Sequence, residues 1–95
     1  MESHRFRTSS AVRASVSADG LVLLDVHDGL LLASNPVGAR IWQLIDERRT
    51  PLEIARQLAE DYDVASECAR RDVLAFITAL VERGLVTQEP TIDLE

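Results

Sequence analysis

The stretch at residues 21–42, LVLLDVHDGLLLASNPVGARIW, limits what this chain can fold into more than any other part of the sequence. It holds two short apolar runs with a His-Asp-Gly turn between them, and an Asn-Pro pair follows the second run at once. Gly29 accepts positive φ without steric cost, so the turn predicts two antiparallel strands. Asn35 can cap the free N–H groups of a helix, and Pro36 suits its first position. The run at residues 30–34 is therefore predicted to be a strand held between a turn and a helix.

A further strand is predicted before this stretch. Val12, Ala14 and Val16 alternate with polar or charged neighbours, which is the period of two that a half-buried strand shows. The Asp-Gly pair at residues 19–20 is a strong hairpin signal. Together the three runs predict a meander in which residues 30–34 lie at an edge of the sheet.

Three helical patterns follow the strands. The first runs from residue 36 to near residue 48, with apolar residues at three- and four-residue spacing. The sequence TPLE at residues 50–53 is a capping box that starts the second helix. The third helix is predicted at about residues 66–83, with Gly84 as its C-terminal cap. We therefore expect a small α+β domain of winged-helix character, with a three-stranded antiparallel sheet followed by three helices.

The 95 residues fit one domain with one modest core. Residues 1–10 are polar and without periodicity, so we expect a disordered tail there. The domain is predicted to span residues 11–87. Residues 88–95 are expected to form a C-terminal tail, and its final Leu94 and Glu95 match the remnant of a cloning tag.

The charge pattern disfavours several classes of partner. A formal net charge of −6 works against nucleic-acid binding, which depends on cationic side chains that neutralise phosphates. No apolar run reaches the roughly 18 residues that cross a bilayer, so we expect no membrane partner. The N-terminus lacks the apolar centre of a signal peptide, and we expect a cytoplasmic protein.

The residue types that carry chemistry are few and scattered. His4 lies in the expected tail and His27 in a turn, and neither has an obvious serine or cysteine partner. Cys68 is the only cysteine and is expected to be a small core residue near the start of the third helix. No zinc-ligand spacing or glycine-rich phosphate loop is present. We therefore expect no enzymatic activity, no metal and no cofactor.

The expected edge strand at residues 30–34 carries no charge, although edge strands are usually protected by charge or proline. Two interpretations stay open. A helix or the extended segment LVTQ at residues 85–88 could cover the edge. Alternatively, a partner peptide could add to the sheet as a further strand, with pockets beside the edge giving specificity.

Three stretches of the chain together resemble the PqqD-like family of peptide-recognition domains. They are GLVLLDVHDGLLLASNPVGARIWQLI, TPLEIARQLAEDYDV and RRDVLAFITALVERGL, and the resemblance covers about residues 12–86. It rests on an ordered set of residues: Asp25 in a strand, Asn35-x-x-Gly38-Ala39-x-Ile41-Trp42, Tyr62-x-Val64, Arg71-Asp72-Val73, Phe76 and Gly84-Leu85. The chain looks most similar to the stand-alone leader-binding proteins of lasso-peptide biosynthesis, and less to the member that serves pyrroloquinoline quinone (PQQ) synthesis.

The resemblance implies a non-catalytic protein that binds the leader of a ribosomally made, modified precursor peptide. The leader would add as an antiparallel strand beside the third strand and pack on the third helix. The protein would deliver it to a maturation enzyme, either a leader protease with its cyclase or a radical SAM enzyme. The peptide-binding residues expected on this basis are Leu30, Leu31, Leu32, Ala33 and Ser34 on the strand, and Ala69, Arg70, Asp72, Val73, Phe76 and Ile77 on the helix.

Other functions stay open at this stage. Three helices joined by short turns are also compatible with an acidic winged-helix transcription regulator or another protein-interaction module. An unprotected edge strand could also pair with its own copy, giving a homodimer through the surface that would bind the peptide.

Overall fold

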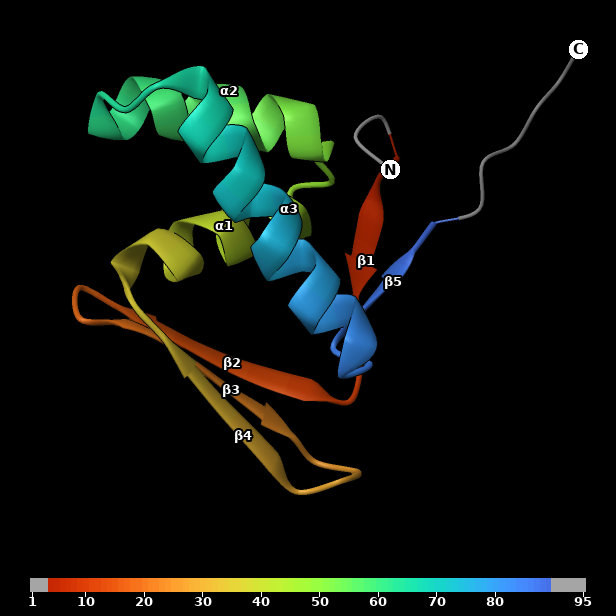
Figure 1. Cartoon of the computed structure of the whole chain (residues 1–95). Helices are drawn as coiled ribbons and strands as arrows, with labels where there is room; N and C mark the ends of the chain where they lie inside the picture. The colour runs from red at the N-terminus through yellow and green to blue at the C-terminus, as the bar shows by residue number, and fades with distance from the viewer. Residues whose placement is uncertain (1–3, 90–95) are drawn as a thin grey trace, which may run out of the picture.

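The computed structural model describes residues 4–89 (Figure 1). Its elements in chain order are β1 (Phe6–Thr8), β2 (Val12–Ser17), β3 (Gly20–Asp25), β4 (Leu30–Ser34), α1 (Pro36–Asp46), α2 (Pro51–Tyr62), α3 (Ser66–Glu82) and β5 (Val86–Gln88). The strands β2, β3 and β4 form an antiparallel meander with β3 at its centre. The three-stranded sheet and three helices confirm the predicted α+β fold class.

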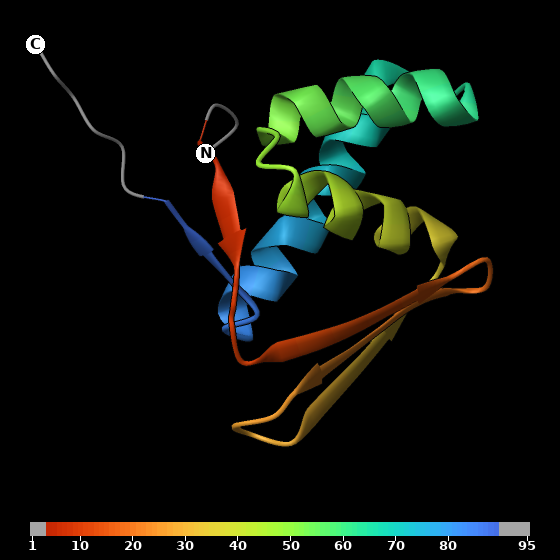
Figure 2. The ribbon, with the colours of Figure 1, turned by 180° about the vertical axis from the view of Figure 1, so that it is seen from behind.

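All three helices lie on the same side of the meander (Figures 1 and 2). Helix α1 packs on β3, and α2 and α3 pack on each other. The side chains of β3 alternate accordingly, because Leu21 and Leu23 are buried under the helices while Val22 and Leu24 are exposed on the other face. Residues from all three helices complete the core, among them Ile45, Ile54, Val73, Ile77 and Leu80.

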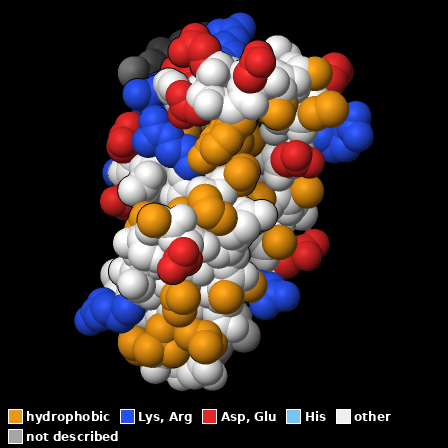
Figure 3. All heavy atoms as spheres, turned by 90° about the vertical axis from the view of Figure 1, so that its left-hand side faces the viewer, with side chains coloured by type: hydrophobic (Ala, Val, Ile, Leu, Met, Phe, Trp, Pro, Cys, Tyr) orange, Lys and Arg blue, Asp and Glu red, His pale blue; other side chains and the backbone are white. Residues whose placement is uncertain are grey.

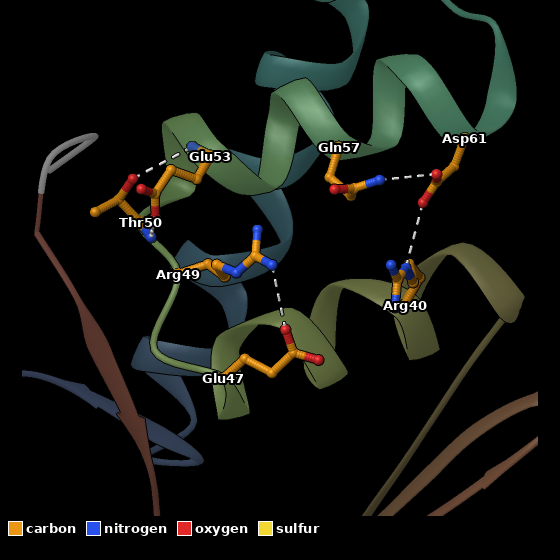
Figure 4. A network of polar contacts seen from close by, with 7 residues as sticks. All are labelled: Arg40, Glu47, Arg49, Thr50, Glu53, Gln57 and Asp61. Carbon is orange, nitrogen blue, oxygen red and sulfur yellow. Dashed lines mark hydrogen bonds and ion pairs between the residues drawn. The ribbon is translucent and has the colours of Figure 1, made fainter.

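Local capping fixes where the helices begin. The Asn35 side chain accepts a hydrogen bond from the Gly38 backbone N–H at 2.9 Å, which caps α1. Thr50 and Glu53 form both hydrogen bonds of the predicted capping box at the start of α2. Arg40 on α1 reaches the Asp61 carboxylate on α2 at 3.3 Å, so polar contacts also tie the two helices together (Figure 4).

The expectation of a disordered tail at residues 1–10 is wrong for residues 6–8. These residues form β1, which pairs antiparallel with β5 in a separate two-stranded sheet. Phe6 is 1% exposed and belongs to the core. Because β1 pairs with β5, the described fold includes residues on both sides of 11–87. The backbone N–H of Glu89 bonds to the Arg5 carbonyl at 2.8 Å. The rest of the two expected tails, residues 1–3 and 90–95 with the tag match at Leu94 and Glu95, lies outside the described residues.

Two further expectations about burial are wrong. Ala14 and Val16 point to the helical side of the sheet, yet both are exposed because α1 covers the centre of the sheet and β2 is its edge. Only Val12 of β2 packs against the core. Cys68 is exposed rather than a core residue, since it falls off the buried stripe of α3 that Ala69, Val73 and Ile77 define.

Candidate functional site

Strand β4 is an open edge of the meander. Within residues 4–89 it pairs with β3 on one side and with no strand on the other. The segment that the sequence offered as a cover, LVTQ, instead pairs with β1. Cover of this edge by the C-terminal strand, one form of the first interpretation, is thereby excluded.

The hydrogen-bond pattern decides which groups of β4 face the open side. The Val26 N–H bonds to the Ala11 carbonyl at 3.0 Å, so Val22, Leu24 and Val26 direct their backbone groups toward β2. The alternate residues of β3 therefore bond to β4, where their partners include Leu32 and Ser34. It follows that the N–H and C=O groups of Leu31 and Ala33 point away from the sheet and are available to another strand.

The side chains of β4 alternate in the same way. Leu31 and Ala33 are exposed on the face opposite the helices, with Leu31 at 63% exposure. Leu32 and Ser34 are half-buried on the helical side. An added strand would thus place the residues opposite Leu32 and Ser34 toward the helices. For Leu30, only the backbone pairing with Asp25 is described.

A hollow of about 190 Å³ lies where the end of β4 meets α1 and α3. Its lining residues are Ser34, Asn35, Val37, Gly38, Ile41, Asp72 and Phe76. Gly38 forms part of its floor because a Cβ there would overlap the Ser34 Oγ and approach the Phe76 ring to 3.3 Å. The hollow is adjacent to the edge on which a peptide strand would lie.

A second hollow of about 100 Å³ continues from the first toward the junction of α2 and α3. It is lined by Val37, Leu58, Tyr62, Val64, Ala69 and Asp72. Since Val37 and Asp72 line both hollows, the two are neighbours, and we call them together the β4–α3 groove. On the face of the molecule that includes the α2–α3 junction, exposed apolar side chains are interspersed with both acidic and basic ones (Figure 3).

The structure places the predicted site residues in three settings: in the lining of the groove, in the core and on the exposed side of α3. Ser34, Ala69, Asp72 and Phe76 line the β4–α3 groove. Val73 and Ile77 are 0% exposed and belong to the core, so they do not line the groove. Arg70 is exposed and pairs with Glu67 at 3.7 Å. Residues two apart on a helix lie about 160° apart around its axis, so Arg70 points away from the hollows that Asp72 lines.

Several groove residues were absent from the predicted site. Asn35, Val37 and Gly38 come from the start of α1, and Tyr62 and Val64 from the α2–α3 junction. Most of these positions belong to the motifs Asn35-x-x-Gly38 and Tyr62-x-Val64, on which the resemblance rested. These motifs were therefore the feature of the sequence that could have identified the missing groove residues. Their position beside β4 follows only from the fold.

The face of the meander opposite the helices is a second apolar surface. Val22 and Leu24 on β3 are 42% and 39% exposed, and they stand directly opposite Ala33 and Leu31 on β4. Antiparallel sheets with one solvated face usually carry polar residues there. Arg13 is the one charged residue among the strand positions on this face, whose β2 positions otherwise carry serine. We call the four apolar residues the outer sheet face.

In the part of the chain that the structure describes, no three His, Cys, Asp or Glu side chains are placed to hold a metal ion. No helix among residues 4–89 combines the length and apolar character needed to span a bilayer.

Comparison with known proteins gives one family and two similar structures. The PqqD family, described as coenzyme PQQ synthesis protein D, matches residues 20–86. The structure of TbiB1 in complex with the TbiA(beta) leader peptide is 32% identical with a TM-score of 0.77, and the match covers 92% of this chain and 99% of that one. The structure of lasso peptide synthetase B1 complexed with the leader peptide is 30% identical with a TM-score of 0.79, over 87% and 98% of the chains. No curated protein matches the sequence.

Proposed function

The chain belongs to the PqqD family as a RiPP recognition element, a domain for ribosomally synthesised and modified peptides, and we propose that it binds the leader of a lasso-peptide precursor without itself catalysing a reaction. The observation that carries this proposal is the open edge of β4 beside the β4–α3 groove. Both similar structures contain a leader peptide.

The edge and the groove together suit an extended peptide. The outward N–H and C=O groups of Leu31 and Ala33 can pair with any backbone, which gives affinity without sequence preference. Alternate side chains of the added strand then point into the hollows lined by Ser34, Phe76 and Asp72, which gives specificity. An extended peptide also loses conformational freedom on binding, which limits the affinity, so we expect sub-micromolar to micromolar dissociation constants, roughly −8 kcal/mol.

We further infer that the protein delivers the bound leader to a maturation enzyme, a leader protease with its cyclase or a radical SAM enzyme. The outer sheet face supports this role, since it offers exposed apolar area on the side of the sheet away from the groove. Leu31 and Ala33 belong both to this face and to the peptide-binding edge. A bound leader would therefore extend the same surface, and an enzyme docked there would contact protein and leader together. Precursor peptides are made on ribosomes, so the proposed site of action is the cytoplasm.

The decisive experiment is an amide NMR titration of the labelled protein with the leader encoded beside its gene. Strand addition predicts shift changes at residues 30–34 and along the groove side of α3, at Asp72 and Phe76. A spectrum that the leader leaves unchanged, together with salt-dependent retention on duplex DNA, would instead favour the winged-helix regulator. Sedimentation of the free protein would show whether β4 pairs with its own copy before the leader arrives.

A further inference from the structure

Asp72 lies at the centre of the β4–α3 groove. It lines both hollows and is exposed. Within residues 4–89 its carboxylate has no ion-pair or hydrogen-bond partner. It lies in the second turn of α3, beyond the first turn in which a helix N-terminus stabilises a negative charge. The groove therefore contains a negative charge that the protein itself does not compensate.

The chain segment at the α2–α3 junction, which borders the second hollow, carries acidic residues. Tyr62 and Val64, which share a hollow with Asp72, flank Asp63 in sequence. The last turn of α2, which ends at Tyr62, carries no basic residue, and its free carbonyl groups add partial negative charge. The nearby Asp61 is paired with Arg40 at 3.3 Å (Figure 4). A positive side chain brought to this end of the groove would therefore meet an attractive field.

Peptide binding would raise the free energy of the Asp72 carboxylate. A strand beside β4 with side chains in the hollows would displace water from Asp72, and a carboxylate that loses water without gaining a partner is destabilising. Arg70, two residues before Asp72, starts from the opposite side of α3 and contacts Glu67 at 3.7 Å, and it lines neither hollow. The peptide itself must then provide the partner.

We propose that the groove selects leaders that carry a lysine or arginine next to Asp72, paired with its carboxylate. This inference rests on the proposed leader-binding function. The residue that carries the charge would be the one opposite Ser34, or the one two residues toward the amino end of an antiparallel leader, because these side chains point to the helical side of the sheet. Asp72 is thus a specificity-determining residue of the site.

The test is a charge scan of the leader encoded beside the gene. Each position of the binding segment is replaced in turn by lysine, glutamine and glutamate in synthetic peptides, and binding is measured by calorimetry. We expect one position at which lysine binds about tenfold more tightly than glutamate, as for a charge-assisted hydrogen bond. This preference should vanish in Asp72→Asn and reverse in Asp72→Lys. Glu82→Gln, the same charge change at an exposed residue of α3 outside both hollows, should retain it.

The outcomes separate this inference from the function on which it rests. If the leaders bind but rank in the same order with the wild type and Asp72→Asn, the role of Asp72 is refuted while leader binding stands. If no peptide of the scan binds the folded wild-type protein, the proposed function itself fails. An equal loss in Asp72→Asn and Glu82→Gln would indicate a general effect of net charge and would also overturn the assignment to Asp72.

Discussion

Gly38 on α1 lies directly against the side chain of Ser34 at the end of β4. A Cβ added at Gly38 would overlap the Ser34 Oγ and come within 3.3 Å of the Phe76 ring. The missing side chain therefore lets the strand end approach the helix and leaves the first hollow open. Glycine is present here for close packing rather than for a special backbone angle, since its φ is not positive.

Replacing this glycine tests whether the hollow receives a peptide side chain. We expect Gly38→Ala to weaken leader binding by about tenfold, or roughly 1.4 kcal/mol, because the new methyl group must displace the Ser34 side chain that lines the hollow. Alanine favours a helix by about 0.5–1 kcal/mol over glycine, which offsets part of the strain at Ser34. Calorimetric titration and urea unfolding of the same variant separate the two effects. An unchanged affinity would mean that the leader does not enter this hollow.

Proline substitution distinguishes the two open edges of the meander. Ala33→Pro removes an N–H that points away from β3, so we expect the fold to persist and leader affinity to fall by about 1 kcal/mol or more. Ala14→Pro is the matched control, since the Ala14 N–H points outward from β2 at the opposite edge. Fluorescence anisotropy with a labelled leader measures both variants. Equal binding by both, or equal loss in both, would contradict strand addition at β4.

The turn that precedes β4 depends on a buried carboxylate. Asp25 is 5% exposed, and its Oδ1 accepts hydrogen bonds from the backbone N–H groups of His27 and Asp28 at 3.0 and 3.3 Å. We expect Asp25→Ala to lower the free energy of unfolding by about 1–3 kcal/mol because both donors lose their partner. Asp25→Asn keeps an acceptor oxygen and should lose less, and the exposed Asp28→Ala serves as control. Urea denaturation followed by circular dichroism gives the three values.

The outer sheet face should matter for delivery and not for leader binding. Leu24→Ser removes an exposed apolar side chain on β3, where a surface change shifts stability by only about 0.5 kcal/mol or less. We expect the variant to bind the leader normally and to support slower leader processing by the maturation enzyme encoded in the same cluster. Ser15→Ala, at a polar position of the same face, is the control. Processing at the wild-type rate would exclude Leu24 from the enzyme contact.

The capping box of α2 predicts a dependence of stability on pH. The backbone N–H of Thr50 donates to the Glu53 carboxylate at 2.9 Å, and this hydrogen bond, aided by the charges of Arg5 and Arg49, lowers the pKa of Glu53. A lowered folded-state pKa means that the stabilisation is present above the unfolded pKa of glutamate, about 4.3, and is lost as the pH falls through the folded value. The stability difference between wild type and Glu53→Gln should therefore shrink in acid. Unfolding curves across this range test it, with the exposed Glu60→Gln as control.

The local signals in the sequence identified most of the elements. The capping box at Thr50 and the Asn35-Pro36 start depend on neighbours within one helical turn, so the sequence alone is enough to recognise them. Phe6 was missed because a three-residue strand has no periodicity, and its partner β5 lies about eighty residues away in the chain. Val16 shows the opposite error, since its alternation is genuine but the helices leave its part of β2, at the edge of the sheet, exposed.

The sequence alone was enough to predict the three strands of the meander, the three helices after them, the family resemblance and the uncharged edge at residues 30–34, because turns, caps and periodicity depend on residues close in the chain. Packing of distant segments sets which backbone groups of that edge point outward and which residues lie beside it. Leu31 and Ala33 point outward because β3 bonds to their neighbours, and Val73 and Ile77 are core because α3 turns that face inward. Gly38, Asp72 and Tyr62 meet in one groove only after three helices pack on one side of the sheet, and contacts at such separations leave no local pattern in the chain.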